Sequence, residues 1–251
     1  MLIIGIIMLF WNKNRKMELW GKILIGFGFL FLGLSVMSSM LKPLKDSDAA
    51  RHLFVSLSHY PVFGILAGTL VTVVVQSSSA SMGLVIVLAN NGLIDFNGAI
   101  YLVLGDNIGT TITAWLASLA ADRSAKRVSL VHSLFNVFGS IIFGTLTYLG
   151  LYNQFIDWIT PGQVNTESIA RHIANSHSFY NILNTLLFLP FVGVLERTAL
   201  KILPADELEQ IPHGEPRYIN YQMLNTPQVA IEQAIFELKE MLILSEMAVN
   251  K

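Results

Sequence analysis

The chain has 251 residues, of which 53% are apolar and only 13% carry a charge. A soluble domain is usually about one quarter charged, so this composition, with a mean hydropathy of +0.56, indicates an integral membrane protein. The net charge of −1 gives no support for nucleic-acid binding, and the absence of cysteine excludes disulfides, thiolate catalysis and cysteine-ligated zinc.

The first part of the chain predicts one membrane span. Met1–Trp11 is apolar but only about half as long as a bilayer requires, and we interpret it as the end of a longer helix or as a short anchor. A basic loop, Asn12–Lys16, follows. Leu19–Leu41 is long and apolar enough to span the membrane, and its glycines and serines suit close helix packing.

The next segment predicts a helical hairpin. Leu53–Gln76 is apolar and helical in character, with breaks at proline and glycine, and Met82–Asn90 is too short to span a bilayer by itself. We expect a re-entrant hairpin of two helical pieces that enters the membrane, turns near Gln76–Ser79 and returns to the same side. Two complete crossings are the alternative, because they leave the following segments on the same sides of the membrane.

Three further spans are predicted at Ala99–Ala121, Val128–Tyr152 and Ile173–Leu195. The first is expected to be a broken transmembrane helix, interrupted at Gly105–Gly109, because two glycines allow a helix to unwind and approach its neighbours closely. The protein is therefore expected to be an all-α polytopic membrane protein.

The positive-inside rule gives the orientation of these spans. With the loop Asn12–Lys16 in the cytoplasm, the basic clusters at Asp122–Arg127 and Arg197–Lys201 fall on the same side. A single crossing in place of the hairpin would break this agreement. We therefore expect a multi-pass protein of the inner (cytoplasmic) membrane with its C-terminal tail in the cytoplasm.

The composition changes at Pro204. Residues 1–203 are expected to form the transmembrane domain, and residues 204–225, rich in proline and charge, a linker. Thr226 and Pro227 then supply an N-cap and a first-turn proline to an amphipathic helix. Its apolar stripe has nothing in this chain to pack against, so residues 226–251 are expected to be the truncated start of a further domain.

One short internal repeat is present. His132–Asn136 has the sequence HSLFN, and His177–Asn181 has the sequence HSFYN. Histidine and asparagine four residues apart lie on one face of a helix. The pattern favours hydrogen bonds between helices that lock their packing, and direct contact with a substrate is the alternative.

Two clusters of polar side chains lie within apolar segments. One is Gln76, Ser77, Ser78 and Ser79, and the other is Asp106, Asn107, Thr110, Thr111 and Thr113. Polar groups in hydrocarbon cost several kcal/mol each unless they are satisfied, so such clusters indicate a ligand or ion site. Hydroxyl and amide oxygens can replace the water around a small alkali cation, while O–H groups, N–H groups and helix N-termini donate to an oxyanion.

Enzymatic activity is not predicted. Ser39–Lys42 fits the pattern S-x-x-K but lacks a K-T-G companion, and the chain contains no G-x-S-x-G. No histidine and carboxylate spacing typical of a metal site stands out. No cofactor is expected beyond a coupling ion.

The segments VQSSSA at 75–80 and LGDNIGTT at 104–111 resemble the type II sodium-dependent phosphate cotransporters, in their bacterial branch. The resemblance extends from about Leu30 to Phe191. The tail that begins EPRYINYQ resembles the start of the PhoU-like helical domain that follows the transporter in bacterial members. The family implies sodium-coupled uptake of inorganic phosphate by alternating access, through two inverted repeats that each carry a QSSS segment.

The resemblance also implies a set of site residues. The QSSS residues would contact sodium and phosphate, Asn107, Thr110 and Thr111 would line the same site, and sodium would be held through Gln76, Ser78, Ser79, Thr110 and Thr111. Secondary candidates are Asp106, Thr113, His132, Asn136, His177 and Asn181. Asp106 departs from the family pattern, in which a small residue is commoner at this position.

The chain contains one QSSS segment, so it resembles the second repeat alone. The missing first repeat would come from the same longer chain or from a homodimer partner. The expected partners are therefore inorganic phosphate, sodium, the lipid bilayer and the missing first repeat. The sequence predicts one half of a sodium/phosphate symporter, and the alternative is a non-transporting membrane scaffold or phosphate sensor that signals through the PhoU-like tail.

Overall fold

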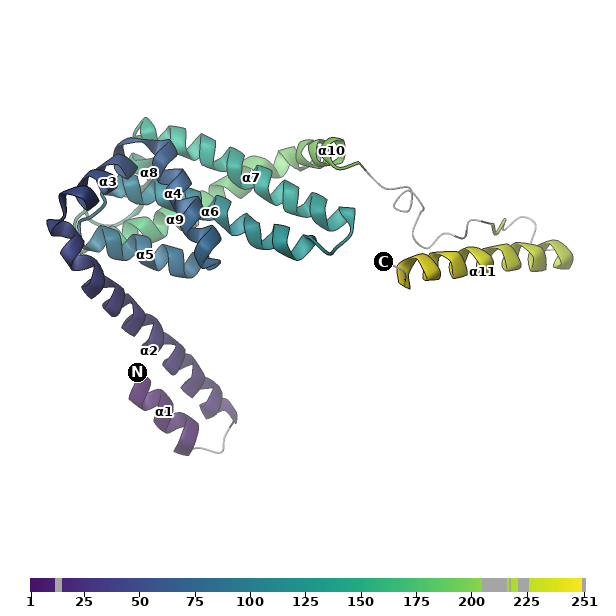
Figure 1. Ribbon diagram of the computed structural model, residues 1–251, viewed down its shortest axis with the longest axis horizontal. Coiled ribbons are helices and arrows are strands. Elements are labelled where there is room, and N and C mark those ends of the chain that lie inside the picture. Colours follow the sequence, from purple (N-terminus) through teal and green to yellow (C-terminus); the bar gives the residue numbers. More distant parts are fainter. Residues whose placement is uncertain (12–14, 205–215, 217, 221–225, 250–251) are drawn as a thin grey trace. The chain divides into compact units, whose positions relative to one another are not determined.

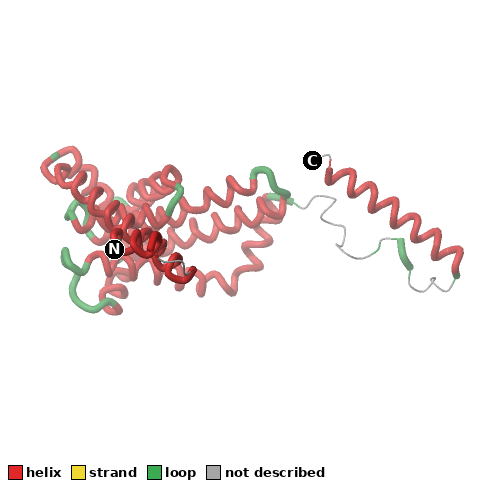
Figure 2. Tube along the Cα trace, turned by 90° about the horizontal axis from the view of Figure 1, so that it is seen from below, coloured by secondary structure: helices red, strands yellow, loops and turns green. Residues whose placement is uncertain are grey.

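A computed structural model describes residues 1–11, 15–204, 216, 218–220 and 226–249 (Figure 1). All regular elements of this described part are helices, which confirms the all-α class (Figure 2). The chain divides into two compact units, Met1–Pro204 and Ala205–Lys251. The predicted sites all lie in the first unit.

The first unit begins with two helices that lie side by side, α1 (Leu2–Trp11) and α2 (Arg15–Leu41) (Figure 1). They approach closely at two glycines, because a Cβ atom on Gly21 would lie only 2.9 Å from the carbonyl oxygen of Gly5. The predicted span Leu19–Leu41 is confirmed as helix α2. Residues 12–14 of the predicted basic loop lie outside the described residues.

A short 3-10 helix η1 (Lys42–Asp46) leads into α3 (Asp48–His59) and α4 (Pro61–Val75). The axes of α3 and α4 differ by 110° at Tyr60. This bend follows from Pro61, which fits the first turn of a helix but disfavours a helical conformation in the residue before it.

Helix α5 (Ser78–Asn90) follows α4 after a turn at Gln76 and Ser77. The turn lies within the segment Gln76–Ser79 where the sequence predicts it. With 15 and 13 residues, α4 and α5 are about 22 Å and 20 Å long, shorter than the roughly 30 Å of a bilayer core. Entry of this hairpin into the membrane from one side stays a prediction, and the helix lengths favour it.

Helix α6 (Phe96–Ser118) is continuous, so the predicted break at Gly105–Gly109 is wrong. Asp95 caps its N-terminus by accepting a hydrogen bond of 2.8 Å from the backbone N–H of Gly98. The first half of α6 is the centre of the hydrophobic core, where Ala99 and Ile100 are completely buried.

The glycines of α6 serve packing instead of unwinding. Gly105 and Gly109 face Ile65 and Thr69 of α4, while Gly64 and Gly68 face Tyr101 and Leu102 of α6. Each helix therefore carries a G-x-x-x-G pattern at the contact. A Cβ atom on Gly105 would overlap the carbonyl oxygen of Ile65, and one on Gly109 would lie 2.7 Å from the carbonyl oxygen of Thr69. The backbones of α4 and α6 therefore touch directly.

The remaining helices of the first unit are α7 (Arg123–Tyr148), α8 (Leu151–Ile159), α9 (Ile169–Phe188), the 3-10 helix η2 (Leu189–Phe191) and α10 (Val192–Ile202). Among the described residues, three helical stretches are long and apolar enough to cross a membrane, 15–44, 123–148 and 169–202. This confirms a multi-pass membrane protein. Helix α6, at the predicted span Ala99–Ala121, is not one of the three.

The second unit contains α11 (Pro227–Val249), which begins directly after the predicted N-cap Thr226. Most of the predicted linker 204–225 lies outside the described residues. The assignment of α11 to a PhoU-like domain stays a prediction.

Candidate functional site

The turn between α4 and α5 holds the first polar cluster, Gln76–Ser79, which we call the tip. Gln76 adopts a left-handed backbone conformation, with φ of 54°, and it is the only non-glycine residue with positive φ in the described part of the chain. Its N–H donates to the carbonyl oxygen of Thr72 at 2.7 Å, which closes α4. Gln76, Ser77 and Ser79 are exposed, and Ser78 is half-buried.

The tip also forms the N-terminus of α5. The Ser77 hydroxyl oxygen accepts a hydrogen bond from the N–H of Ala80 at 3.3 Å, so Ser77 is the N-cap. The N–H groups of Ser78 and Ser79 lie in the first turn, where a helix offers no carbonyl partner. Together with the positive end of the helix dipole, they form a donor-rich surface suited to an anion.

The second cluster lies along the continuous helix α6. Thr110 donates its hydroxyl hydrogen to the carbonyl oxygen of Asp106, and Thr111 donates to Ile108, both at 2.8 Å. Thr113 donates in the same way to Thr110, and the side-chain amide of Asn107 donates to Val103 at 2.9 Å. Because these hydrogens are engaged with the helix itself, the side-chain oxygens keep lone pairs that could serve as ligands of a cation.

The contact between α4 and α6 determines the positions of the two polar clusters along the helix axes. Gly64 packs against Tyr101, Gly68 against Leu102, and Gly109 against Thr69 and Thr72, so the two helices run in the same direction. One turn beyond the contact at Gly109, α4 ends at the tip and α6 reaches Thr113. The tip therefore lies at the level of the polar turns of α6.

A third group of polar side chains lies below the tip, and only Asp106 of this group was identified from the sequence. The Thr72 hydroxyl of α4 donates to the Asp106 carboxylate at 2.6 Å and lies 3.1 Å from the hydroxyl oxygen of Ser81 on α5. Thr72, Ser81 and Asp106 are 1%, 2% and 1% exposed. They border a cavity of about 30 Å³. We call these three residues the deep cluster.

The histidine and asparagine pairs differ from the prediction. The amides of Asn136 and Asn181 donate to the carbonyl oxygens of His132 and His177 in their own helices, both at 2.9 Å. The predicted hydrogen bonds between helices are therefore wrong for these amides, since the carbonyl four residues earlier is the nearest acceptor. Tyr180 links α9 to α7 instead, through its hydroxyl, which donates to the Asn136 carbonyl at 3.3 Å.

The two histidines lie in different surroundings. His177 of α9 is half-buried and lies within electrostatic range of Asp106. His132 of α7 borders a hollow of about 320 Å³ against α9 and η2, which Asp106 does not line. Of the secondary candidates, Asp106 and His177 are therefore brought together, and His132 borders a different hollow.

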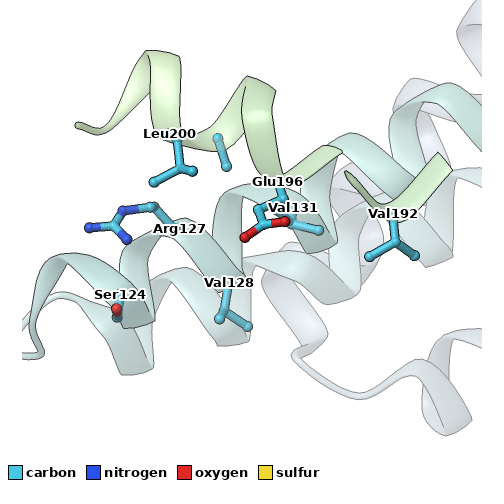
Figure 3. Close-up of a pocket in the computed structure, with 8 residues that line it drawn as sticks. Ser124, Arg127, Val128, Val131, Val192, Glu196 and Leu200 are labelled. Carbon is cyan, nitrogen blue, oxygen red and sulfur yellow. The ribbon is translucent and has the colours of Figure 1, made fainter. Parts of the chain in front are cut away.

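A further hollow of about 290 Å³ lies between α7 and α10 (Figure 3). Arg127 of α7 and Glu196 of α10 lie beside an otherwise largely apolar lining that includes Val128, Val131 and Val192. None of the residues predicted for the site lines this hollow. The polar groups suited to a small inorganic ion thus lie at the tip, on α6 and in the deep cluster.

Comparison with known proteins identifies a family model and several relatives. Residues 37–156 match the family model described as Na+/Pi-cotransporter. The YjbB protein of Escherichia coli K12, whose name describes inorganic phosphate export, is 29% identical over 94% of this chain and 42% of its own length. The chain therefore spans well under half the length of this relative. No solved structure gave a significant match.

Two other relatives match parts of the chain. YqeW of Bacillus subtilis, which is named as uncharacterized, is 28% identical over 81% of this chain and 64% of its own length. The sodium-dependent phosphate transport protein 2A of Rattus norvegicus is 36% identical over 45% of this chain and 19% of its own length. Both polar clusters lie inside residues 37–156, the segment that matches the Na+/Pi-cotransporter family model.

Proposed function

We propose that the chain is one repeat half of a sodium-coupled symporter, which carries inorganic phosphate across the cytoplasmic membrane by alternating access. The observation that carries this proposal is the position of the tip, a donor-rich helix N-terminus that lies about one helical turn beyond the contact between α4 and Gly109 of α6. The match of residues 37–156 to a family model of cotransporters supports it, as does the name of the rat relative. Such a site binds and releases ions without breaking a covalent bond, so we infer a transporter and not an enzyme.

Phosphate binds at the tip in this proposal. The N–H groups of Ser78 and Ser79, the serine hydroxyls and the Gln76 amide supply donors for its oxygens. The positive end of the α5 dipole adds roughly 0.3–1 kcal/mol of favourable interaction with an anion. The four residues Gln76–Ser79 carry no charge. The tip is therefore expected to bind phosphate only weakly when no cation is present.

Sodium binds beside phosphate, at oxygens of α6 and of the tip. Thr110, Thr111 and Asn107 donate their hydrogens to their own helix, which leaves their oxygens free to replace water around the ion. A bound sodium ion adds positive charge to a site otherwise made of neutral groups. Affinity for the anion then rises, and by linkage phosphate raises the affinity for sodium by the same factor.

The rest of the transporter completes the site. In this proposal the missing first repeat, from the same longer chain or from a second copy of this chain, covers the exposed face of the tip. The C-terminal tail with α11 lies in the cytoplasm, on the side of the basic clusters Asp122–Arg127 and Arg197–Lys201.

The test is uptake of radiolabelled phosphate by proteoliposomes that contain the complete transporter. We expect Ser78→Ala to lower sodium-driven uptake about tenfold or more, because a hydrogen bond to a charged group contributes about 1.5–3 kcal/mol. Thr145→Ala is the matched control, since Thr145 is exposed on α7 and donates only to Ile141 of its own helix. Wild-type uptake by the Ser78→Ala protein would reject the site.

A sodium gradient separates this function from its alternatives. A phosphate sensor or scaffold that signals through the tail would bind phosphate but give no flux, with or without the gradient. The Escherichia coli relative is named for phosphate export, so efflux from preloaded vesicles is measured in parallel. If phosphate efflux does not depend on sodium and no sodium-driven uptake is measured, the protein is an exporter and the symport proposal is rejected.

A further inference from the structure

The hollow between α7 and α10 continues into the hollow that α7 forms with α9 and η2, so that one groove runs along α7. The two hollows share three lining residues, Val128, Val131 and Val192. Along α7, the groove begins at Ser124 and ends at Phe135. Figure 3 shows the part of the groove that begins at Ser124.

The groove suits one hydrocarbon chain in shape and in length. Its walls are mainly valine, leucine and phenylalanine side chains, and Val128 and Val192 are 69% and 53% exposed, so the groove is open to the surroundings. Ser124 and Phe135 lie about 16 Å apart along the helix axis. One leaflet of a bilayer core is about 15 Å thick, half of the roughly 30 Å of the whole core. Because α7 is one of the candidate membrane spans, the groove has the length of an acyl chain in one leaflet.

The end of the groove beside Ser124 is basic. Arg127 lines the groove and is half-buried. The described residues 122–127 and 192–204 contain two carboxylates, those of Asp122, which caps α7, and Glu196, which also lines the groove. The same two segments contain five basic side chains, those of Arg123, Lys126, Arg127, Arg197 and Lys201. The described residues that line the part near Phe135 include no aspartate, glutamate, lysine or arginine. Positive charge at one end and an apolar lining beyond it match the two parts of an anionic phospholipid.

We propose that this groove binds one anionic phospholipid, with an acyl chain along the three shared valines and the phosphate beside Arg127 and Ser124. A guanidinium offers paired N–H donors to phosphate oxygens, and the exposed Ser124 hydroxyl offers a further donor. The surrounding lipid tails are as apolar as the groove, so burial of the chain contributes little. The groove therefore positions the lipid, and the basic side chains select its headgroup.

The orientation proposed above places this end of α7 in the cytoplasm. The cytoplasmic leaflet carries a negative surface potential, and basic pockets between membrane helices on that side suit anionic headgroups. Binding of the lipid requires neither phosphate ions nor sodium, so the site is independent of the proposed transport function.

The experiment counts the lipid molecules bound to the 251-residue chain by native mass spectrometry in detergent. Dioleoyl phosphatidylglycerol is compared with dioleoyl phosphatidylcholine, which has the same chains but no net charge. We expect one phosphatidylglycerol molecule to bind selectively. Arg127→Gln is expected to weaken this binding about fivefold, because it removes one basic side chain beside the headgroup. Arg171→Gln, at an exposed arginine of α9 that lines neither hollow, is the matched control and should bind as the wild type does.

A second variant tests the apolar part of the groove. Val128→Trp places a large side chain in the segment that the two hollows share, and we expect it to lower phosphatidylglycerol binding by at least the same factor. Ile182→Trp is the matched control, because Ile182 is 51% exposed on α9 and lines neither hollow.

Equal binding of the two lipids, or phosphatidylglycerol binding that neither Arg127→Gln nor Val128→Trp weakens, would overturn the proposal. If these variants do not fold, the wild-type protein is measured in about 1 M sodium chloride, where the Debye length is about 3 Å, and selective binding that does not weaken would overturn it equally. Release of the lipid by inorganic phosphate alone would indicate a site for a free anion instead. Loss of the selective binding in the complete transporter would show that the first repeat covers the groove, and would also reject the lipid site. Lipid binding that persists while sodium-driven uptake fails would reject only the transport function.

Discussion

Gln76 shows how one residue can set the direction of a helix pair. Its left-handed backbone, with φ of 54°, ends α4 and lets Ser77 begin the cap of α5. This conformation costs about 1–2 kcal/mol for a residue with a side chain, and glycine would adopt it freely. A glutamine at such a position suggests that its amide group has a use that offsets the strain, such as contact with an ion.

Two substitutions at Gln76 separate the backbone from the side chain. Gln76→Gly is expected to change the stability of the folded chain by less than about 1 kcal/mol, whereas Gln76→Val loses about 2 kcal/mol, because a β-branched residue is strained at positive φ. Thermal unfolding in detergent measures both. Sodium-driven phosphate uptake should fall in both variants, since both lack the amide. Equal stability of the glycine and valine variants would contradict the backbone argument.

At the scale of elements, the contact between α4 and α6 fixes where the polar groups meet. Thr72 and Asp106 reach each other because glycines allow the two backbones to approach. The hydroxyl of Thr69 adds a hydrogen bond across the contact, with 3.1 Å to the carbonyl oxygen of Gly105. Close packing, reinforced by such bonds, stabilises helix pairs in membranes, where burial against lipid contributes little.

Gly105→Ala tests this contact. A methyl group there would overlap the carbonyl oxygen of Ile65, so we expect the helices to move apart and the chain to lose about 1–3 kcal/mol of stability. Gly26→Ala in α2 is the control, because nothing lies within 4 Å of its Cβ position and alanine favours a helix by about 1 kcal/mol. If Gly105→Ala were as stable as Gly26→Ala, direct backbone contact would be excluded.

The same contact explains what the sequence could and could not reveal. Hydropathy located α2, α7 and α9, and the polar run Gln76–Ser79 located the turn, because these signals are local. The glycines of α6 are ambiguous in the sequence, since glycine permits both unwinding and close packing of a helix. The only sign that favours packing is the G-x-x-x-G pattern of Gly64 and Gly68 in α4. Thr72 and Ser81 escaped notice because a lone hydroxyl in an apolar helix usually bonds to its own backbone. Their role depends on the meeting of three helices.

At the scale of the whole molecule, the depth of the tip decides the topology. A re-entrant hairpin leaves the tip inside the membrane, whereas two complete crossings would bring it to the cytoplasmic surface. The lengths of α4 and α5, about 22 Å and 20 Å, favour the hairpin. The chain has no cysteine, so a single introduced cysteine is the only thiol that can be labelled, and its reactivity reports whether that position is accessible to water.

Labelling with a membrane-impermeant thiol reagent distinguishes these topologies. In oriented vesicles, Ser124→Cys, in the basic first turn of α7, should react from the cytoplasmic side. Asn97→Cys, at the start of α6, should react from the opposite side. If the hairpin is re-entrant, Ser77→Cys is expected to react much more slowly than Ser124→Cys, because the tip then lies within the membrane. Addition of phosphate and sodium should slow the labelling of Ser77→Cys further. Equally fast cytoplasmic labelling of both positions would indicate two complete crossings.

The glycines between α4 and α6 restrict how the protein can move. Neither helix can slide along the other without a glycine hydrogen meeting a carbonyl oxygen, so the two form one rigid body. We therefore expect alternating access to involve rotation at the joints that lack such contacts, the bend at Tyr60 and the turn at Gln76–Ser77. In the proposed function, the N-terminus of α5 supplies donors for phosphate, and α6 together with the tip supplies oxygens for sodium. A swing of α5 would then weaken the contacts of both ions in one step.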